Sequence, residues 1–451
     1  MSKSQEPAES DSPVNGANRR SFLKGGGLML AGGAIAGSKL SVAQGAHAFG
    51  SDTIKIGLIG CGGRGTGAAI QMLSAEGDTQ LVAMADAFQS NLQTAYRTIK
   101  GRHPKSIPVD HRRFVGLDGY RGVMESDADL VILATPPGFR PEQFEAAVES
   151  GKHVFMEKPV ATDAPGVRRV LAANKIAKEE GLAVQVGLHR RHEIRYRECI
   201  DHLQSGMIGD LLFARVYWNG GESWCQARKS EQSELEYQLR NWHHFNWLGG
   251  DQIVEQHVHN LDVINWLMQS HPVEAQGQGG RAERSPTTCG HVFDQHMIEF
   301  TYAGGFKLLS QCRHRKGCWN SISEHVHGTN GTATISEATI RDGSGKKKWQ
   351  SDLQEIRGKG WQQEQNALIA SLRAGQISNE GDYGAYSTMT AIMGRMATYS
   401  GKRVKWDDAF YSEVRLADTN AIHSLADSPP VQRDEAGNYP LPVPGSKTKH
   451  V

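Results

Sequence analysis

The stretch IKIGLIGCGGRGTG, residues 54–67, carries the pattern on which the predicted fold rests. Its first six residues are mostly aliphatic or β-branched, which is typical of a strand buried on both faces. Gly60, Gly62 and Gly65 follow as G-x-G-x-x-G, and apolar residues at helical spacing come next. A strand, a glycine turn and a helix in this order indicate a dinucleotide-binding unit, because the glycines let the backbone approach a pyrophosphate and the helix start favours its charge. The alternative is a purely structural glycine turn.

The second predicted strand, residues 80–85, ends at Asp86, about 20 residues after the last glycine, which is the spacing of a ribose-binding acid. A carboxylate at this place accepts hydrogen bonds from both ribose hydroxyls of NAD and repels the 2′-phosphate of NADP. No arginine follows immediately, since the next residues are Ala87 and Phe88. The sequence therefore predicts NAD rather than NADP.

Two further buried strands, residues 130–134 and 153–156, alternate with helical patterns, as in a doubly wound parallel sheet. The second of these strands leads into Lys158 and Pro159. Ligands bind beyond the carboxyl ends of the strands in such sheets, so Lys158 is predicted to point into the ligand crevice. A surface turn is the alternative for a Lys-Pro pair.

Five features match one known family: the glycine loop, Asp86, Thr135-Pro136, GKHVFMEKP at 151–159 and VGLHRR at 186–191. Together they resemble the glucose–fructose oxidoreductase, inositol dehydrogenase and rhizopine-catabolism (Gfo/Idh/MocA) family. The resemblance implies an α/β protein with an N-terminal Rossmann domain. It also implies a C-terminal α+β domain, whose large, mostly antiparallel sheet forms the dimerisation surface. The cofactor-binding residues predicted on this basis are Gly60, Gly62, Gly63, Arg64, Gly65, Asp86, Thr135, Pro136, Glu157 and Lys158.

A helix is predicted from residue 251 to about residue 268, and on it Glu255, His259 and Asp262 share one face. In the family that the chain resembles, this helix carries an Asp-x-x-x-His pair at the nicotinamide end of the cleft. Glu255 and His259 occupy the matching positions, with Glu in place of Asp. The predicted catalytic residues are Lys158, as a positive charge and proton-transfer group, His259, as the proton carrier, and Glu255, which orients His259 or binds a hydroxyl.

Two other interpretations of this helix remain open. Glu255, His259 and His243 could form a metal site, although the set lacks a convincing third ligand. The polar face could also be purely structural.

The segment WHHFNW, residues 242–247, combines aromatic and polar side chains in the way that a sugar site does. An aromatic interface patch is the alternative. An irregular stretch at 220–238 precedes it and is predicted to be a substrate loop. The predicted substrate-binding residues are Arg191, Trp242, His243, His244 and Asp262.

The N-terminal segment, residues 1–48, resembles a twin-arginine export signal in its NRRSFLK motif, its Gly/Ala-rich apolar run and its A-x-A site at 46–48. The run is too short and glycine-rich for stable membrane insertion. The formal net charge of +1 gives no basic field for nucleic acid or a membrane surface. Among the six cysteines, Cys312 and Cys318 could pair in an oxidising compartment, which the sequence leaves open.

The predicted domains are a Rossmann domain at 52–180, a substrate and oligomerisation domain at 181–425, and a loosely ordered tail at 426–451. The loosely ordered tail is predicted from its proline content, and the second domain is predicted from a β-meander between residues 273 and 340. A homodimer or homotetramer is expected.

The leading functional hypothesis is an NAD-dependent oxidoreductase acting on a hydroxyl of a sugar, cyclitol or glycoside, in the periplasm or another extracytoplasmic space. Export separates the protein from the cytoplasmic NAD pool, so the cofactor is expected to stay bound and to be regenerated within each cycle. Sugar–sugar redox exchange meets this condition. So does glycoside cleavage by oxidation, elimination and hydration, a reaction that resembles that of the NAD-dependent α-N-acetylgalactosaminidases and is kept as the alternative. A non-catalytic sugar-binding protein is the alternative of another class.

Overall fold

The computed structural model describes residues 53–282, 290–353 and 359–446. The predicted export signal at 1–48 therefore lies outside the described residues. Within them, two β-sheets are present, one of six strands and one of nine.

The first sheet has the order β3-β2-β1-β4-β5-β6, and every neighbouring pair is parallel. Its chain order reverses between β1 and β4, which places a crevice at the carboxyl ends of these adjacent strands. This arrangement confirms the predicted Rossmann domain. The strands are β1 (Ile54–Ile59), β2 (Thr79–Asp86), β3 (Arg112–Val115), β4 (Leu130–Leu133), β5 (His153–Met156) and β6 (Val184–Val186).

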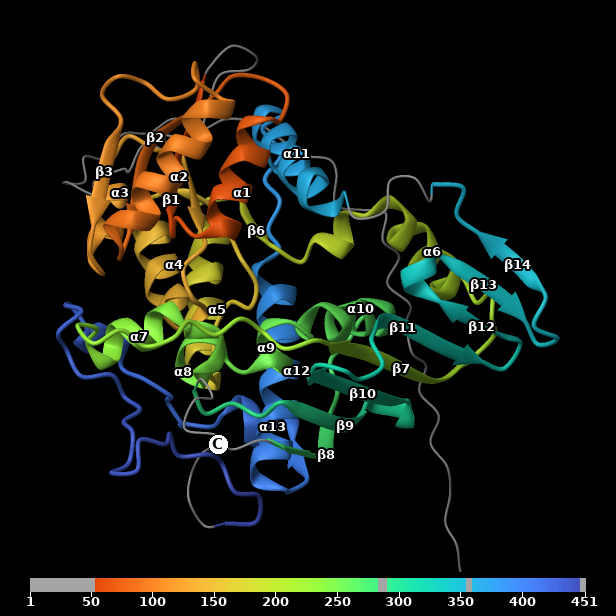
Figure 1. Cartoon of the computed structure of the whole chain (residues 1–451). Coiled ribbons are helices and arrows are strands. Elements are labelled where there is room, and N and C mark those ends of the chain that lie inside the picture. The colour runs from red at the N-terminus through yellow and green to blue at the C-terminus, as the bar shows by residue number, and fades with distance from the viewer. Residues whose placement is uncertain (1–52, 283–289, 354–358, 447–451) are drawn as a thin grey trace, which may run out of the picture. The chain divides into compact units, whose positions relative to one another are not determined.

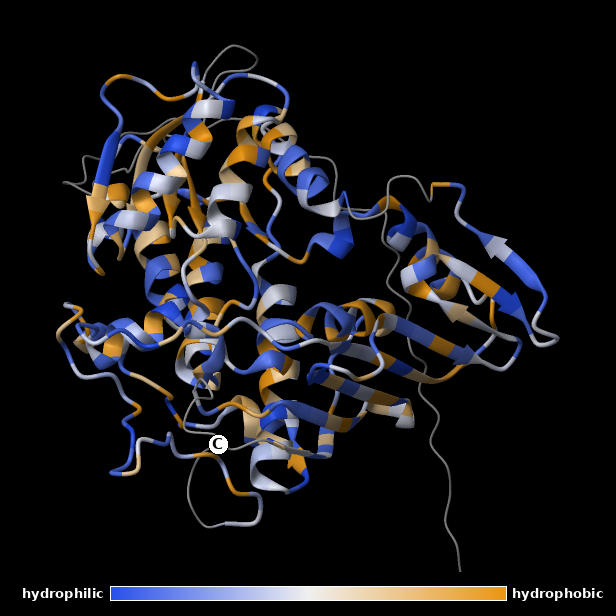
Figure 2. Cartoon of the chain, in the orientation of Figure 1, coloured by the Kyte–Doolittle hydropathy of each residue, from blue (hydrophilic) through white to orange (hydrophobic). Residues whose placement is uncertain are grey.

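Helices cover both faces of this sheet, and the apolar residues of its strands form the core between them (Figures 1 and 2). One cover comes from far along the chain: α11 (Gly360–Arg373) packs beside α1, and its Leu368 and Ile369 join the core that contains Ile56 and Leu58. The remaining helices of this part are α1 (Gly63–Leu73), α2 (Gln89–Arg102), α3 (Gly119–Met124), α4 (Arg140–Glu149) and α5 (Ala164–Glu179).

The boundary between the two predicted domains differs in the structure. We expected the second domain to begin at residue 181, but β6 pairs in parallel with β5, with Val184 opposite Val154. Without β6, the backbone groups along this edge of β5 would be unpaired. The first domain therefore extends past residue 186.

The second sheet has the order β14-β13-β12-β11-β7-β10-β9-β8-β15 and is antiparallel except between β7 and β10. This confirms the predicted α+β domain. Helices α10 (Val258–Met268) and α12 (Gly381–Ser400) pack against one face of the sheet. The strands are β7 (Leu211–Gly220), β8 (Glu274–Gly280), β9 (Gln295–Thr301), β10 (Lys307–His314), β11 (Ser321–Gly328), β12 (Gly331–Thr334), β13 (Thr339–Asp342), β14 (Lys347–Gln350) and β15 (Val404–Lys405).

The helix expected from residue 251 to 268 is divided into α9 (Gln252–Glu255) and α10. Asp251, which precedes α9, has a φ of 78°, a value that is rare for a non-glycine residue. Its fully buried carboxylate accepts hydrogen bonds from Phe293 N at 3.1 Å and Tyr399 Oη at 2.6 Å. These contacts from distant segments hold Asp251 in its backbone conformation and fix where α9 begins.

The segment predicted to be a substrate loop contains α7 (Glu234–Arg240), and the C-terminal tail packs against it. Gln238 Nε2 donates to the Val431 carbonyl at 2.7 Å, and the Tyr439 hydroxyl donates to Glu234. We expected a loosely ordered tail from residue 426, but its described part, up to residue 446, makes specific contacts. Short helices α6 (Ile194–Gln204), α8 (Asn246–Gly249) and α13 (Trp406–Phe410) complete the fold.

Cys312 is buried and Cys318 exposed, and both are free thiols, so the pairing left open by the sequence is not formed. Cys225 is disulfide-bonded. None of the helices in the described part of the chain has the length and apolar character needed to cross a bilayer.

Candidate active site

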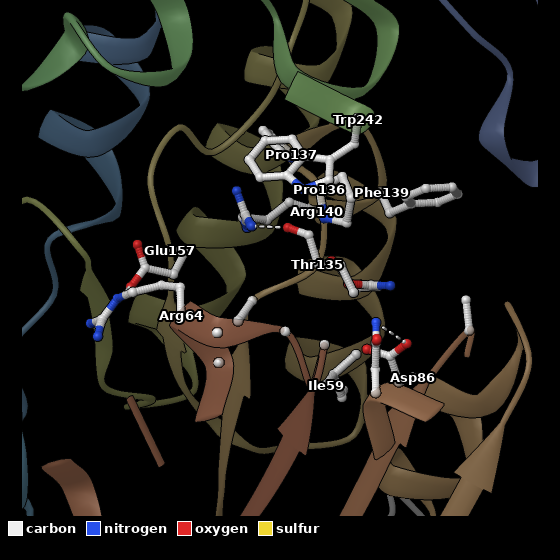
Figure 3. A pocket seen from close by; sticks show the side chains of 18 of the residues that line it. Ile59, Arg64, Asp86, Thr135, Pro136, Pro137, Phe139, Arg140, Glu157 and Trp242 are labelled. Atoms are coloured by element: carbon white, nitrogen blue, oxygen red, sulfur yellow. Dashed lines mark hydrogen bonds and ion pairs between the residues drawn. The ribbon is translucent and has the colours of Figure 1, made fainter. Parts of the chain in front are cut away.

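A cavity of about 420 Å³ opens at the carboxyl ends of β1, β2, β4 and β5 (Figure 3). All ten residues predicted to bind the cofactor line it, as do the three predicted catalytic residues. Residues of the second domain, including Trp218 and Gln256, close its far end. The structure thus joins the glycine loop and the catalytic residues in one continuous space.

The glycine loop has the shape that a pyrophosphate requires. Gly60 has a φ of +94°, and a Cβ on it would lie 2.5 Å from the Ala134 carbonyl carbon. A Cβ on Gly65 would lie 1.9 Å from the Gly60 carbonyl oxygen, so only glycine permits this close packing. Gly62 and Gly63, in contrast, face open space. The loop therefore leaves room for a dinucleotide phosphate in front of the N-terminus of α1.

Asp86 lies at the end of β2 on the cavity wall. Its Oδ2 accepts from Cys61 N at 2.7 Å and its Oδ1 from Phe88 N at 2.8 Å. Burial raises the pKa of Asp86 above its ordinary value, although these backbone hydrogen bonds oppose the shift. The carboxylate is thus fixed in orientation beside the position where a dinucleotide ribose fits.

Arg64 is held by three side chains at the edge of the glycine loop. Its guanidinium donates to Glu157, to Glu364 Oε1 at 3.1 Å and to Gln71 Oε1 at 2.8 Å. Glu364 lies on α11, so Arg64 links this helix to the glycine loop. Figure 3 shows Arg64 and Glu157 side by side on the cavity wall.

Lys158, Glu255 and His243 form a chain of buried polar contacts. Lys158 Nζ lies 2.9 Å from Glu255 Oε1, and His243 Nε2 lies 3.0 Å from Glu255 Oε2. Burial alone would raise the pKa of Glu255, but the ammonium of Lys158 and the bond to His243 outweigh it and hold the pKa well below its usual range. Glu255 is therefore a carboxylate at neutral pH and anchors the lysine.

His259 follows one turn after Glu255 and faces the same cavity. Burial, and next the charge of Lys158, lower the pKa of His259 well below its ordinary value of 6.5. Its ring packs edge-on against His189, with centroids 4.8 Å apart, and lies nearly parallel to Trp218 at 5.9 Å. His259 is therefore a neutral imidazole that can accept a proton at neutral pH.

The five predicted substrate-binding residues lie in different places. Trp242 lines the cavity together with Pro136 and Pro137 (Figure 3). His243 lies behind Glu255, as described above. His244 Nε2 bonds the Trp224 carbonyl at 2.6 Å, and it is not among the lining residues.

Arg191 and Asp262 bind each other instead. The guanidinium of Arg191 donates to both oxygens of Asp262, with distances of 2.8 to 3.1 Å. Asp262 also accepts from Ser387 on α12 at 2.8 Å. Neither residue lines the cavity. The pair instead links η2 (His189–His192) to α10 and, through Ser387, to α12.

Arg140, His189, Trp218 and Trp361 are among the lining residues that the sequence analysis did not assign to the site. Buried Arg140 donates to the carbonyls of Thr135 and Pro159 and so ties together the loops after β4 and β5. His189, Trp218 and Trp361 form an aromatic wall at the far end. Trp218 lies on β7, on the same face as the buried Ala214 and Val216, so strand alternation accounts for its inward position. Trp361 lies on a helix whose packing partner no local pattern reveals.

The described residues hold no group of three or more histidine, cysteine, aspartate or glutamate side chains arranged for a metal ion. Glu255, the central residue of the metal alternative, is already bound to Lys158 and His243.

A Rossmann sheet whose glycine loop opens on a lysine and a neutral histidine defines a nicotinamide-nucleotide oxidoreductase. The sequence profile "Oxidoreductase family, NAD-binding Rossmann fold" matches residues 54–188, and the profile "GFO/IDH/MocA C-terminal domain" matches residues 196–334. The chain belongs to the GFO/IDH/MocA family of NAD-binding oxidoreductases, as its motifs predicted.

Curated relatives and solved structures agree with this assignment. An inositol 2-dehydrogenase of Pseudomonas fluorescens is 26% identical over 344 residues, covering 75% of this chain and 92% of the relative. The scyllo-inositol dehydrogenase of Lactobacillus casei, solved with NAD(H) and scyllo-inositol, has a TM-score of 0.61 at 18% identity, covering 79% of this chain and 100% of that chain. A levoglucosan dehydrogenase solved with NADH and levoglucosan also has a TM-score of 0.61, at 17% identity, covering 78% and 99%. The two solved structures share the fold of this chain.

Proposed function

We propose that this enzyme transfers a hydride between a hydroxyl-bearing ring carbon of a sugar or cyclitol and NAD. The observation that carries the proposal is the position of Lys158 and His259 together at the end of the nucleotide cavity. The relatives named as inositol 2-dehydrogenases support the substrate class. No relative reported above is a glycosidase, and the comparisons give that alternative no support.

Bound NAD supplies the hydride acceptor. Burial and the lysine charge keep His259 uncharged at neutral pH, so its ring nitrogen is unprotonated and available to receive the hydroxyl proton. Lys158, held by Glu255, presents its ammonium to the oxygen on which negative charge develops. The ion pair thus keeps the lysine in place while leaving the histidine free to take the proton.

The direct test is NADH formation from NAD by the purified protein with a panel of cyclitols, hexoses and methyl glycosides. We expect turnover of at least one polyhydroxylated ring and none of simple aliphatic alcohols. A separate sample of the purified protein should be denatured first, to identify any nucleotide that the protein carries. A protein that binds NAD but oxidises no member of the panel contradicts the proposal.

We further propose that NAD stays bound between turnovers. Leu239 and Trp242 line the cavity opposite the Rossmann loops, and the Arg240 guanidinium lies 4.0 Å from the centroid of the Phe88 ring. The tail braces this cover through Tyr439, and the segment before the tail is anchored at the N-cap of α5, where Asp163 Oδ2 accepts from Leu416 N at 2.9 Å. Release of the cofactor then requires these contacts to open.

Export by the twin-arginine route, into the periplasm or another extracytoplasmic space, is a separate proposal. It is supported by the NRRSFLK motif, and the disulfide at Cys225 fits an oxidising compartment. Cell fractionation tests it: replacing Arg19 and Arg20 by lysine should leave the precursor in the cytoplasm, whereas unchanged export overturns it.

We also propose that two or more copies associate through the outer face of the nine-stranded sheet. Met297 on β9 and Leu309 on β10 are 55% and 37% exposed on that face, opposite core residues of the same strands. Exposed apolar side chains on adjacent strands are typical of an interface. Light scattering of the protein and of the variant carrying Met297→Lys and Leu309→Lys tests this association.

A further inference from the structure

Four aromatic rings form a continuous row along one wall of the cavity. Trp361 packs against His189, His189 against His259, and His259 against Trp218, with centroid distances of 4.8, 4.8 and 5.9 Å. The row runs from Trp218 past the proposed proton acceptor His259 to Trp361, which is 45% exposed. The cavity wall therefore offers more ring surface than one sugar at His259 can cover.

Trp361 is held firmly in its position at the end of the row. It follows Gly360, where a Cβ would lie 2.6 Å from the His189 carbonyl oxygen, so the helix approaches η2 as closely as glycine allows. The helix is also tied to the Rossmann domain, because Gln362 Nε2 donates to the Gln71 carbonyl at 2.8 Å and Arg64 binds Glu364. The indole is thus preorganised without a covering side chain on much of its surface.

Trp218 has a different environment from Trp361. Its ring is only partly exposed, stacks on His259 and receives the Arg190 guanidinium 5.7 Å from its centroid. Trp218 therefore lies beside the proposed proton acceptor, next to the sugar ring that is being oxidised. Trp361, beyond His189, suits a second ring further from the reacting atoms.

We propose that Trp361 forms a subsite for a second ring joined to the oxidised sugar through its glycosidic oxygen, so that the preferred substrate is a glycoside. This inference rests on the proposed oxidoreductase function and narrows its substrate class. The second ring stacks its flat C–H or aromatic face on the indole, and its glycosidic bond stays intact. The reacting carbon loses a hydride to NAD and its hydroxyl loses a proton, as with a free sugar.

The test compares wild type with Trp361→Ala, and uses Trp319→Ala as the control. Trp319 is a similarly exposed indole, at 63%, on the turn after β10, and it does not line the cavity. Each protein is loaded with NADH, and calorimetry measures its affinity for a panel of free monosaccharides, the matching disaccharides and the matching phenyl glycosides. The kcat/KM with NAD is measured on the same panel.

We expect wild type to bind at least one glycoside about tenfold more tightly than the corresponding free sugar, which corresponds to about 1.4 kcal/mol. Trp361→Ala should remove that advantage while leaving the free sugar unchanged, and Trp319→Ala should change neither. A gain with disaccharides alone assigns the second ring to a sugar, and an equal gain with phenyl glycosides assigns it to any flat ring.

Equal affinity of wild type for glycosides and free sugars overturns the subsite. An equal loss for both in Trp361→Ala overturns it too, since the residue then serves the reacting ring. Tight glycoside binding that depends on Trp361 but gives no turnover supports the subsite and contradicts the proposed oxidoreductase reaction.

Discussion

The ammonium of Lys158 lies 2.9 Å from Glu255 Oε1, and this ion pair joins the end of β5 in the Rossmann domain to α9 in the second domain. Both side chains are almost buried, with 11% and 9% of their surfaces exposed. Removal of one partner from a buried pair leaves the other charge uncompensated, which is far costlier than the loss of a surface salt bridge. The pair is therefore a structural joint between the domains as well as part of the catalytic site.

Replacement of either partner should lower the activity, and it should also lower the stability because the other charge stays buried without its partner. Lys158→Met should lower kcat by about 10²–10⁴-fold, because it removes the group that stabilises charge on the substrate oxygen. Glu255→Gln should lower both kcat and the thermal midpoint, since it leaves the lysine with a weaker partner. Glu255→Asp keeps the charge and should retain more activity than Glu255→Gln. Equal activity of the two glutamate variants contradicts an anchoring role for the carboxylate.

The neutral state of His259 makes a prediction about pH. Because its pKa is lowered, the base form persists in mild acid, and the acidic limb of kcat/KM should lie below pH 6.5. Lys158→Met removes one cause of the shift, so NMR titration of His259 in that variant should give a higher pKa than in wild type. His259→Asn should lose about 10²–10⁴-fold in kcat. An acidic limb above pH 6.5 that persists in His259→Asn argues for a different base.

The nucleotide half of the site was predictable because its signals are local. Gly60 and Gly65 carry their backbone or packing requirement in the residue type itself, and Asp86 follows at the end of a mostly apolar strand. The substrate half depends on contacts between distant segments. Helical spacing correctly placed Glu255 and His259 on one wall, but it could not reveal that Arg191 would bind Asp262 away from the cavity.

Other differences between prediction and structure also arise from contacts between segments that are distant in the sequence. The start of α9 depends on Asp251, whose conformation is held by Phe293 and Tyr399 from other segments. The tail after residue 426 contains prolines and no long apolar run, yet Val431 and Tyr439 find partners on α7. Neither outcome is encoded in the few residues on either side.

Cofactor choice should depend on Asp86. We expect Asp86→Ser to lower kcat/KM for NAD by about 10–100-fold, the range expected when hydrogen bonds to a charged group are lost, and to raise it for NADP. Asp86→Asn is the matched control, because it removes the charge but keeps most of the shape near Cys61 and Phe88. Steady-state kinetics with both nucleotides provide the measurement. An unchanged NAD to NADP ratio in both variants rules out discrimination by this carboxylate.

Retention of NAD should depend on the cover formed by α7 and the tail. Tyr439→Phe removes the hydroxyl that bonds Glu234 and accepts from Arg228 at 2.9 Å, and Leu239→Ala opens the cavity wall. Both should raise the rate of NADH release about tenfold, which corresponds to about 1.4 kcal/mol. Tyr411→Phe, whose ring is 66% exposed, is the control. Stopped-flow fluorescence of bound NADH measures the rates, and identical release from all four proteins excludes a retaining role.

Acid should destabilise the folded protein before its carboxylates titrate, because several histidines are buried as neutral rings. Burial is the main cause that lowers the pKa of His257 to about 3, and those of His111, His244 and His314 to about 4. Their ordinary value is 6.5, so between pH 6.5 and 4 these four histidines bind more protons in the unfolded chain than in the folded one. The free energy of unfolding must then fall as the pH falls, by up to about 1.4 kcal/mol per pH unit for each histidine.

Denaturant unfolding at pH 7.5, 6.5, 5.5 and 4.5 should show this decline. His257→Gln, which replaces a fully buried ring bonded to Ser310 Oγ at 2.8 Å, should be less stable at pH 7.5 but should lose stability more gradually in acid. The control is His423→Gln, since 62% of that side chain is exposed, and its curve should run parallel to that of wild type. If stability is constant from pH 6.5 to 4.5, the buried rings are not neutral in the folded state, and the assignment of His259 as a neutral base loses its physical basis as well.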